Sequence, residues 1–112
     1  MNLDPILEYL RRVVLPELDA ALDLVAAEGR SDLDLARGRR HRADVEAMLS
    51  LRHGPQTIAA YLLERADRLE AVPAPLSEAE RRYVASHAPW CRGAAEALGR
   101  ARVHEVRVRA AA

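Results

Sequence analysis

The chain has 112 residues, half of them apolar, and 17 basic residues balance 17 acidic residues to a formal net charge of zero. This length allows one small core and excludes two full domains. A single Cys excludes an internal disulfide, and no apolar run approaches the length of a membrane span. The N-terminus also lacks the basic and apolar regions of a secretion signal. We therefore expect a cytoplasmic protein; its basic residues are all Arg, which is typical of a GC-rich bacterial or phage genome.

The stretch over residues 3–28 has the apolar spacing of a helix. Asp4 and Pro5 form a start signal, and Gly29 is a natural end. Pro16 removes a hydrogen bond in mid-helix, so we expect it to kink the helix or divide it in two. Steps of three and four place these apolar residues on one side: Leu3, Leu7, Leu10, Val14, Leu18, Ala21 and Val25.

A second helix begins after Ser31, which forms a capping box with Asp34, and runs to His53 before Gly54 and Pro55. The short turn at residues 29–30 predicts that the first two helices form an antiparallel hairpin over residues 3–53. In the second helix, the expected apolar positions are Leu33, Ala36, Ala43, Ala47, Met48 and Leu51.

A third helix is expected over residues 55–72, followed by a stiff Pro-containing linker at 72–76. A capping box at 77–80 begins a fourth helix, which we expect to stop or bend at Pro89. A fifth helix then runs to Leu98 and ends at Gly99.

After Gly99 we expect a short helix with a frayed tail, although the alternation of Val and Arg also suits a lone strand. The predicted fold is therefore all-α: a single-domain bundle of four to five helices, with an N-terminal helical hairpin and basic C-terminal helices over 77–109.

Charge is segregated along the chain into four blocks. Residues 1–36 carry −5, residues 37–56 carry +3, residues 57–80 carry −3 and residues 81–112 carry +5. The blocks either neutralise one another inside the fold, or the last of them faces an anionic ligand.

The run from Arg37 to Arg42 interrupts the apolar spacing of the second helix. It is either a phosphate or nucleic-acid patch, or it is neutralised across the hairpin. With a turn at residues 29–30, residue i of the first helix lies level with residue 60 − i of the second. We therefore predict interhelix ion pairs that join Arg37 and Arg40 to Glu17, Asp19 or Asp23.

The spacing of Arg82 and His87 is similar to the R-x4-H motif of HEPN-type ribonucleases, which are small helical dimers. The resemblance implies an Arg that polarises a phosphate and a His that moves a proton near neutral pH. Among so many Arg residues this spacing is expected by chance, so the ribonuclease stays an alternative.

A metal site from His87, Cys91 and His104 lacks a convincing fourth ligand, and Pro89 breaks the register between the first two. We therefore expect no metal and no cofactor.

The segment from Gly93 to Arg109 resembles a helix-turn-helix, with Ala95, Leu98 and Gly99 in the positions of the small residue, the core Leu and the turn Gly. A basic cap over the acidic blocks is the alternative. The resemblance implies a nucleic-acid-binding set of Arg92, Arg100, Arg102, Arg107 and Arg109.

No Gly-rich phosphate loop, nucleophile elbow or paired-carboxylate site is present, which argues against an enzyme. We expect a small nucleic-acid-associated protein, either a regulator or a phage-type DNA-packaging adaptor. The alternative is a protein-interaction adaptor that acts through the hairpin. We further expect a homo-oligomer or a protein partner, because a Leu/Ala core of this size is thin.

Overall fold

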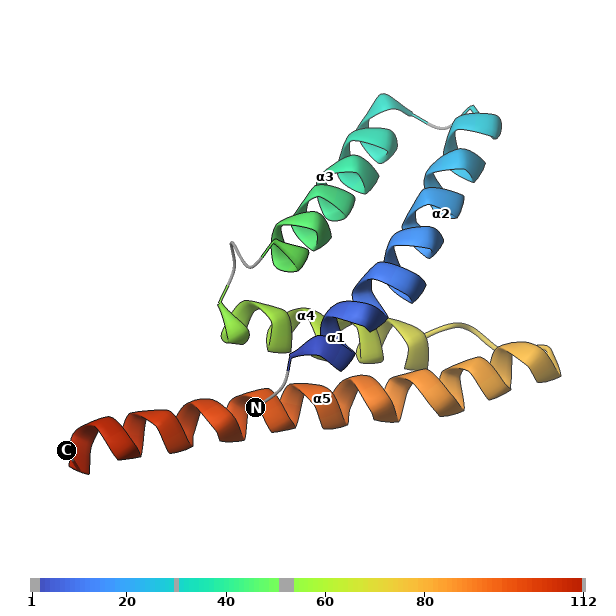
Figure 1. Cartoon of the computed structure of the whole chain (residues 1–112). Helices are drawn as coiled ribbons and strands as arrows, with labels where there is room; N and C mark the ends of the chain where they lie inside the picture. The colour runs from blue at the N-terminus through green and yellow to red at the C-terminus, as the bar shows by residue number, and fades with distance from the viewer. Residues whose placement is uncertain (1–2, 30, 51–53, 112) are drawn as a thin grey trace. The chain divides into compact units, whose positions relative to one another are not determined.

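The computed structural model describes residues 3–29, 31–50 and 54–111, with side chains up to Arg100. All regular elements among these residues are helices, which confirms the expected all-α class (Figure 1). They fall into two compact units, Asn2–His53 and Gly54–Ala112. Whether the two units together form the expected single domain stays a prediction. Within the described residues, no helix combines the length and the apolar character needed to cross a membrane.

The first unit begins with α1 (Asp4–Tyr9), a π-helical turn η1 (Leu10–Val14) and α2 (Leu15–Ala27). In η1 the Leu15 N–H donates to the Leu10 carbonyl, five residues back rather than four. This wider turn comes just before Pro16, which has no N–H of its own to donate. The chain therefore stays helical through Pro16. Where a kink or a division of the helix was expected, the backbone hydrogen bonds change from a four-residue to a five-residue spacing.

Helix α3 (Asp32–Leu49) begins as expected. Ser31 is its N-cap, and the Ser31 hydroxyl accepts a hydrogen bond from the Asp34 N–H at 3.3 Å. Gly29 has a φ of 66°, the left-handed conformation that glycine adopts at low cost after a helix. The helix ends at Leu49, and the expected end at His53 lies outside the described residues.

Close packing at Gly38 supports the predicted antiparallel hairpin. A Cβ at this position would lie 2.6 Å from Leu22 Cδ2 of α2. Residues 22 and 38 were expected to lie level with each other in the antiparallel hairpin, because residue i of the first helix lies level with residue 60 − i of the second. Gly38 therefore allows α2 and α3 to approach closely, which outweighs its low helix propensity.

The expected apolar side of α3 is partly wrong. Val45 and Met48 are the buried residues of this helix, whereas Leu33, Ala36 and Ala43 are exposed. The contacts of α3 with α2 include a glycine, Gly38, and an arginine, Arg42, which apolar spacing does not identify.

The second unit consists of α4 (Pro55–Glu70) and α5 (Glu78–Ala111), joined by the expected non-helical linker. The capping box before α5 is confirmed by two reciprocal bonds. The Glu80 N–H donates to Ser77 Oγ at 3.1 Å, and the Ser77 N–H donates to Glu80 Oε1 at 3.0 Å. The hydrogen bonds that the Ser77 backbone N–H and, to a smaller extent, the Ser77 side chain make to the Glu80 carboxylate stabilise its ionised form and lower the pKa of Glu80.

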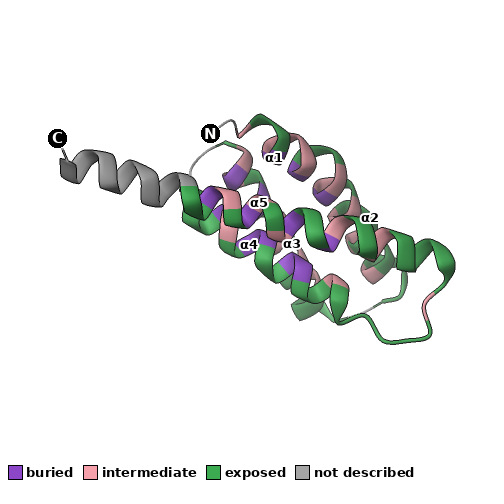
Figure 2. Cartoon of the chain, turned by 90° about the horizontal axis from the view of Figure 1, so that it is seen from below, coloured by how far each residue is buried: buried purple, intermediate pink, exposed green. Residues whose placement is uncertain are grey.

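The expected stop at Pro89 and the expected helix end at Gly99 are wrong, because α5 is one continuous helix of 34 residues. Pro89 and Ala85, whose carbonyl the missing N–H would have bonded, are both exposed, so the ring and the free carbonyl lie on the solvent side. On the side of α5 opposite Pro89, buried residues recur at helical spacing before and after the proline. These residues pack against α4, and both helices bury side chains along the length that they share (Figure 2). The buried residues of α5 are Ala88, Cys91, Ala95 and Leu98.

Candidate nucleic-acid interface

Arg92 joins α5 to the acidic side of α4. Its Nη2 lies 2.8 Å from Asp67 Oδ1 and 2.9 Å from Glu70 Oε2, and its Nε donates to Glu70 Oε1 at 3.0 Å. The hydrogen bonds from Arg92 lower the pKa of Glu70, and those to Glu70 and Asp67 raise the pKa of Arg92. Arg92, predicted to bind nucleic acid, is thus paired inside its own unit, in the manner of a basic cap over an acidic block.

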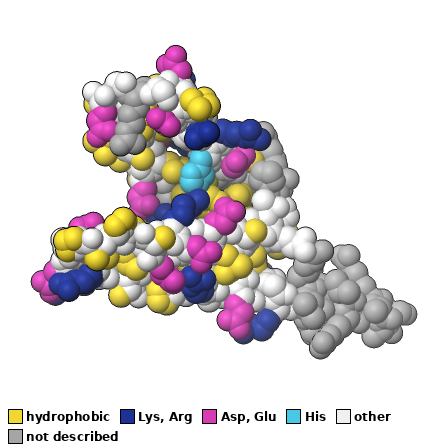
Figure 3. All heavy atoms as spheres, turned by 180° about the vertical axis from the view of Figure 1, so that it is seen from behind, with side chains coloured by type: hydrophobic (Ala, Val, Ile, Leu, Met, Phe, Trp, Pro, Cys, Tyr) yellow, Lys and Arg dark blue, Asp and Glu magenta, His cyan; other side chains and the backbone are white. Residues whose placement is uncertain are grey.

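Arg82 and Arg100 form ion pairs along α5 itself. Arg82 Nη2 lies 2.6 Å from Glu78 Oε1, and Arg100 Nη1 lies 2.9 Å from Glu96 Oε1, both at i,i+4 spacing. All four side chains are exposed. On the surface seen in Figure 3, basic and acidic side chains lie beside one another. Exposed pairs of this kind are weak, so Arg100 can exchange its carboxylate for a phosphate.

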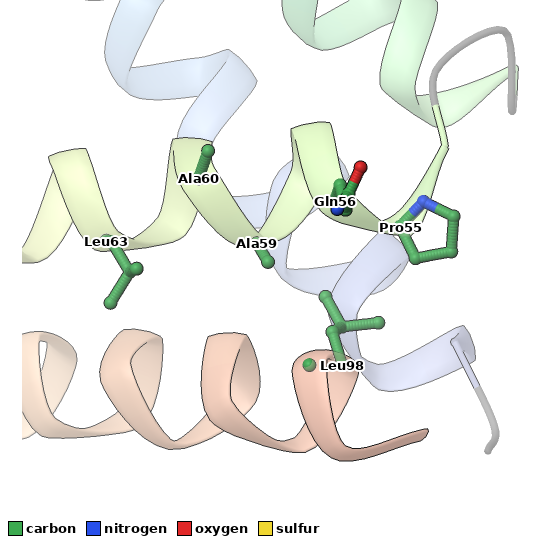
Figure 4. A pocket seen from close by; sticks show the side chains of 7 residues that line it. Pro55, Gln56, Ala59, Ala60, Leu63 and Leu98 are labelled. Carbon is green, nitrogen blue, oxygen red and sulfur yellow. The ribbon is translucent and has the colours of Figure 1, made fainter. Parts of the chain in front are cut away.

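The last part of α5 extends beyond α4. Leu98 points from α5 toward the first turn of α4, and with Gly99, Pro55 and Gln56 it lines a shallow apolar hollow of about 240 Å³ (Figure 4). Because the two helices run antiparallel, the residues after Gly99 pass the start of α4 (Figure 1). Eleven helical residues, 101–111, correspond to about 16 Å of helix.

The sequence changes character where α4 begins. Up to residue 98 the spacing of three and four falls on the buried residues of α5, and it then continues onto charged residues: Arg102, Glu105 and Arg109. Among the described side chains of α5, Leu98 is the last buried one. The side chains of Arg102, Arg107 and Arg109 lie outside the described part of the structure.

The Arg37–Arg42 run is attached to α2 through a residue that the sequence analysis did not select. Arg42 Nε lies 2.5 Å from Asp19 Oδ1 and also pairs with Glu46, and these hydrogen bonds raise the pKa of Arg42. Level matching placed Asp19 opposite residue 41, one residue away, so allowing a step of one would have found Arg42. Arg37 and Arg40 are exposed, and their pairing with Glu17, Asp19 or Asp23 stays a prediction.

The structure does not bring Arg82 and His87 together. At 100° per residue, five residues separate them by about 140° around α5. Arg82 pairs with Glu78, whereas the His87 ring stacks on Tyr83 with centroids 3.9 Å apart. Tyr83 has a further partner that no sequence pattern indicated: the Tyr83 hydroxyl accepts a hydrogen bond at 3.0 Å from Arg65, whose exposed fraction is 6%.

Cys91 is buried among the apolar residues of α5, and His104 lies outside the described side chains. Over the described residues, no group of three or more His, Cys, Asp or Glu side chains is placed to hold a metal ion. Comparison with protein-family models, curated proteins and solved structures finds no match to this chain.

Proposed function

We propose that the protein is a non-enzymatic, nucleic-acid-associated protein that binds through the C-terminal part of α5. The observation that carries this proposal is the extension of α5 past the first turn of α4. The extending segment 100–111 contains four Arg and one Glu. A basic helix that continues beyond its supporting helix is a form in which proteins enter the major groove of DNA.

This arrangement differs from the helix-turn-helix resemblance. A helix-turn-helix needs a turn at Gly99, and α5 passes through that residue without one. The proposed contact therefore uses one helix held at its base by α4. Arg92 belongs to this base, because Asp67 and Glu70 hold it. Arg100, Arg102, Arg107 and Arg109 remain as the proposed contacts.

Phosphate contacts account for such binding better than base contacts do. Four Arg within ten residues supply charge for several phosphates, and each contact releases counterions, so affinity falls with salt. Four contacts imply a slope of log K against log salt of roughly −3 to −4.

The test is a titration of duplex DNA at several salt concentrations with the full chain. Replacing Arg107 and Arg109 together by Ala is expected to reduce the magnitude of the slope by about two while circular dichroism stays unchanged. The matched control replaces Arg11 and Arg12, which removes the same charge from a different unit and is expected to leave the slope unchanged. An absence of wild-type binding at low salt, or an equal effect of both pairs, would overturn the proposal.

The two finer roles, regulator and packaging adaptor, differ in sequence preference. A regulator uses a base contact, so Arg102→Ala is expected to relax the preference at one position of its site. A packaging adaptor relies on phosphates, and the same substitution is expected to weaken all duplex sequences alike.

A protein-interaction adaptor that acts through the hairpin is the second candidate. A specific observation favours it: α2 has no buried residue, although it carries five Leu or Val side chains. This role does not exclude the first, because hairpin and α5 belong to different units.

A further inference from the structure

The four Arg residues in the C-terminal part of α5 follow a repeated pattern. Arg100 and Arg102 are two residues apart, and Arg107 and Arg109 repeat this spacing seven residues later. Residues 100–111 belong to one continuous helix, so the backbone fixes where each residue lies around the helix axis. At 100° per residue, Arg102 is rotated by about 160° from Arg100, whereas Arg107 returns to within about 20° of Arg100. The same step of seven residues places Arg109 on the side of Arg102.

The four Arg residues therefore form two rows on nearly opposite sides of the helix. We call Arg100 with Arg107 the first row, and Arg102 with Arg109 the second row. Within each row, the two residues are about 10 Å apart along the helix axis. A flat anionic surface meets one side of a helix and so cannot meet both rows. A ligand with phosphates on both sides of the helix meets both.

The two sides of the helix that lie between the rows differ in composition. Helical rotation places three aliphatic residues on one of them: Val103, Val106 and Ala110. We call this the aliphatic side. The opposite side includes Val108 and the acidic Glu105. A polyanion that approaches the aliphatic side therefore meets an Arg row on each flank and leaves Glu105 on the far side of the helix.

We propose that the C-terminal part of α5 lies in the major groove of B-form DNA, with its aliphatic side toward the base pairs and one Arg row along each strand. This inference rests on the proposed function and names the duplex that the helix selects. The major groove is about 12 Å wide and admits a helix, and a phosphate backbone borders it on each side. Thymine methyl groups on the floor of this groove accept apolar contacts, which suits the aliphatic side.

The two Arg rows and the aliphatic side fit other anionic ligands less well. The major groove of A-form RNA is deep and narrow, so a helix does not enter it. A helix that lies in a membrane surface buries Trp, Phe or Leu between its basic flanks. The aliphatic side has two Val and one Ala instead, which bury little apolar area. B-form DNA is thus the ligand that both rows and the aliphatic side favour.

The first experiment compares the two rows in the full chain. One variant carries Arg100→Gln and Arg107→Gln, and the other carries Arg102→Gln and Arg109→Gln, so both lose the same charge from the same segment. In titrations of duplex DNA at several salt concentrations, each variant is expected to reduce the magnitude of the slope of log K against log salt by about two. Circular dichroism checks that both variants fold as the wild type does.

The outcomes of this experiment separate the inference from the proposed function. If the wild-type chain binds duplex DNA but only one of the two variants changes the slope, the helix is contacted on one side and the inference is overturned while the proposed function stands. If the wild-type chain binds no duplex at low salt, both are overturned.

The second experiment tests which side of the helix faces the base pairs. Val106→Glu places an acid on the aliphatic side and is expected to weaken the binding of duplex DNA by roughly tenfold or more. The matched control Val108→Glu makes the same change on the opposite side and is expected to have a clearly smaller effect. Equal losses in the two variants would overturn this orientation.

The third experiment compares ligands at one salt concentration. The wild-type chain is expected to bind duplex DNA roughly tenfold or more tightly than an RNA duplex of the same sequence. Phosphatidylglycerol vesicles are expected to compete poorly for the chain. An RNA duplex that binds as tightly as the DNA duplex would overturn the major-groove mode. Vesicles that displace the DNA would show that the Arg rows flank a membrane-binding side instead.

Discussion

Both units have apolar residues at helical spacing, but the two units differ in how many of these residues they bury. Helices α4 and α5 bury apolar side chains along both helices, including Ile58, Leu62 and Leu98. The part of the hairpin nearest its turn, residues 15–28 and 32–44, which we call the outer hairpin, has comparable Leu and Val residues but buries none of those described. Apolar spacing therefore predicts which side of a helix is available for packing, but it does not tell whether that side is covered. In the outer hairpin, the contacts between α2 and α3 include the close approach at Gly38 and the ion pair of Arg42 with Asp19.

The largest expected effect is in the α4–α5 core. Leu62 is fully buried, and Leu62→Ala is expected to lower the free energy of unfolding by about 2–5 kcal/mol, through lost burial and the cavity left behind. The neighbouring Leu63→Ala, on the exposed side, is expected to cost less than about 1 kcal/mol. Urea unfolding measures both variants. Leu22→Ala sharpens the comparison, because a cost equal to that of Leu62→Ala would mean that the outer hairpin is as well covered as the core.

A smaller effect is expected at the polar contact inside the second unit. Tyr83→Phe removes the hydroxyl that accepts from the buried Arg65, and it is expected to cost about 1–3 kcal/mol. The exposed Arg82→Ala, one residue away, is expected to cost about 0–1 kcal/mol. Thermal unfolding compares the two, and equal losses would show that the Arg65 contact adds nothing to stability.

Two glycine substitutions are expected to differ in their effect. Gly93 is exposed on α5, and an added Cβ meets no atom within 4 Å, so Gly93→Ala is expected to stabilise by about 0.5–1 kcal/mol. Gly38→Ala is expected to lose this gain, because its Cβ displaces the Leu22 side chain. Adding Leu22→Ala removes the clash. Chemical denaturation is therefore expected to show that Gly38→Ala is more favourable to the free energy of unfolding in the Leu22→Ala background than in the wild-type chain. Equal gains at both glycines would disprove the close approach of α2 and α3.

The smallest effect concerns pH. Hydrogen bonds from Arg92 lower the pKa of Glu70 in the folded protein below its ordinary value of 4.5. The unfolded chain therefore takes up the proton first, so this contribution is present above about pH 4.5 and is lost as pH falls through the folded pKa. In Arg92→Gln, NMR titration is expected to show the pKa of Glu70 rising toward its ordinary value. The pKa of Glu80, held low by Ser77, is expected to stay unchanged and serves as the control.

The sequence by itself determined the all-α class, the hairpin turn and the starts of the helices. These features depend on contacts between near neighbours, such as the Ser77–Glu80 capping box and the turn at Gly29. The level matching across the hairpin also followed from the sequence, because helical rise is constant. The close approach of Gly38 to Leu22 agrees with this matching, and the partner of Asp19 differs from it by one residue.

Only the tertiary structure decided the fate of Pro89 and Gly99. Locally both residues favour a break, but the burial of Ala88 to Leu98 against α4 stabilises a helix that continues through them. Packing also decided which Arg residues are paired: Arg92 meets the acids of α4 because α5 continues as a helix beyond Pro89. The candidate interface thus changed from a helix-turn-helix to the end of one long helix, because burial along α4 outweighed the local preference for a turn.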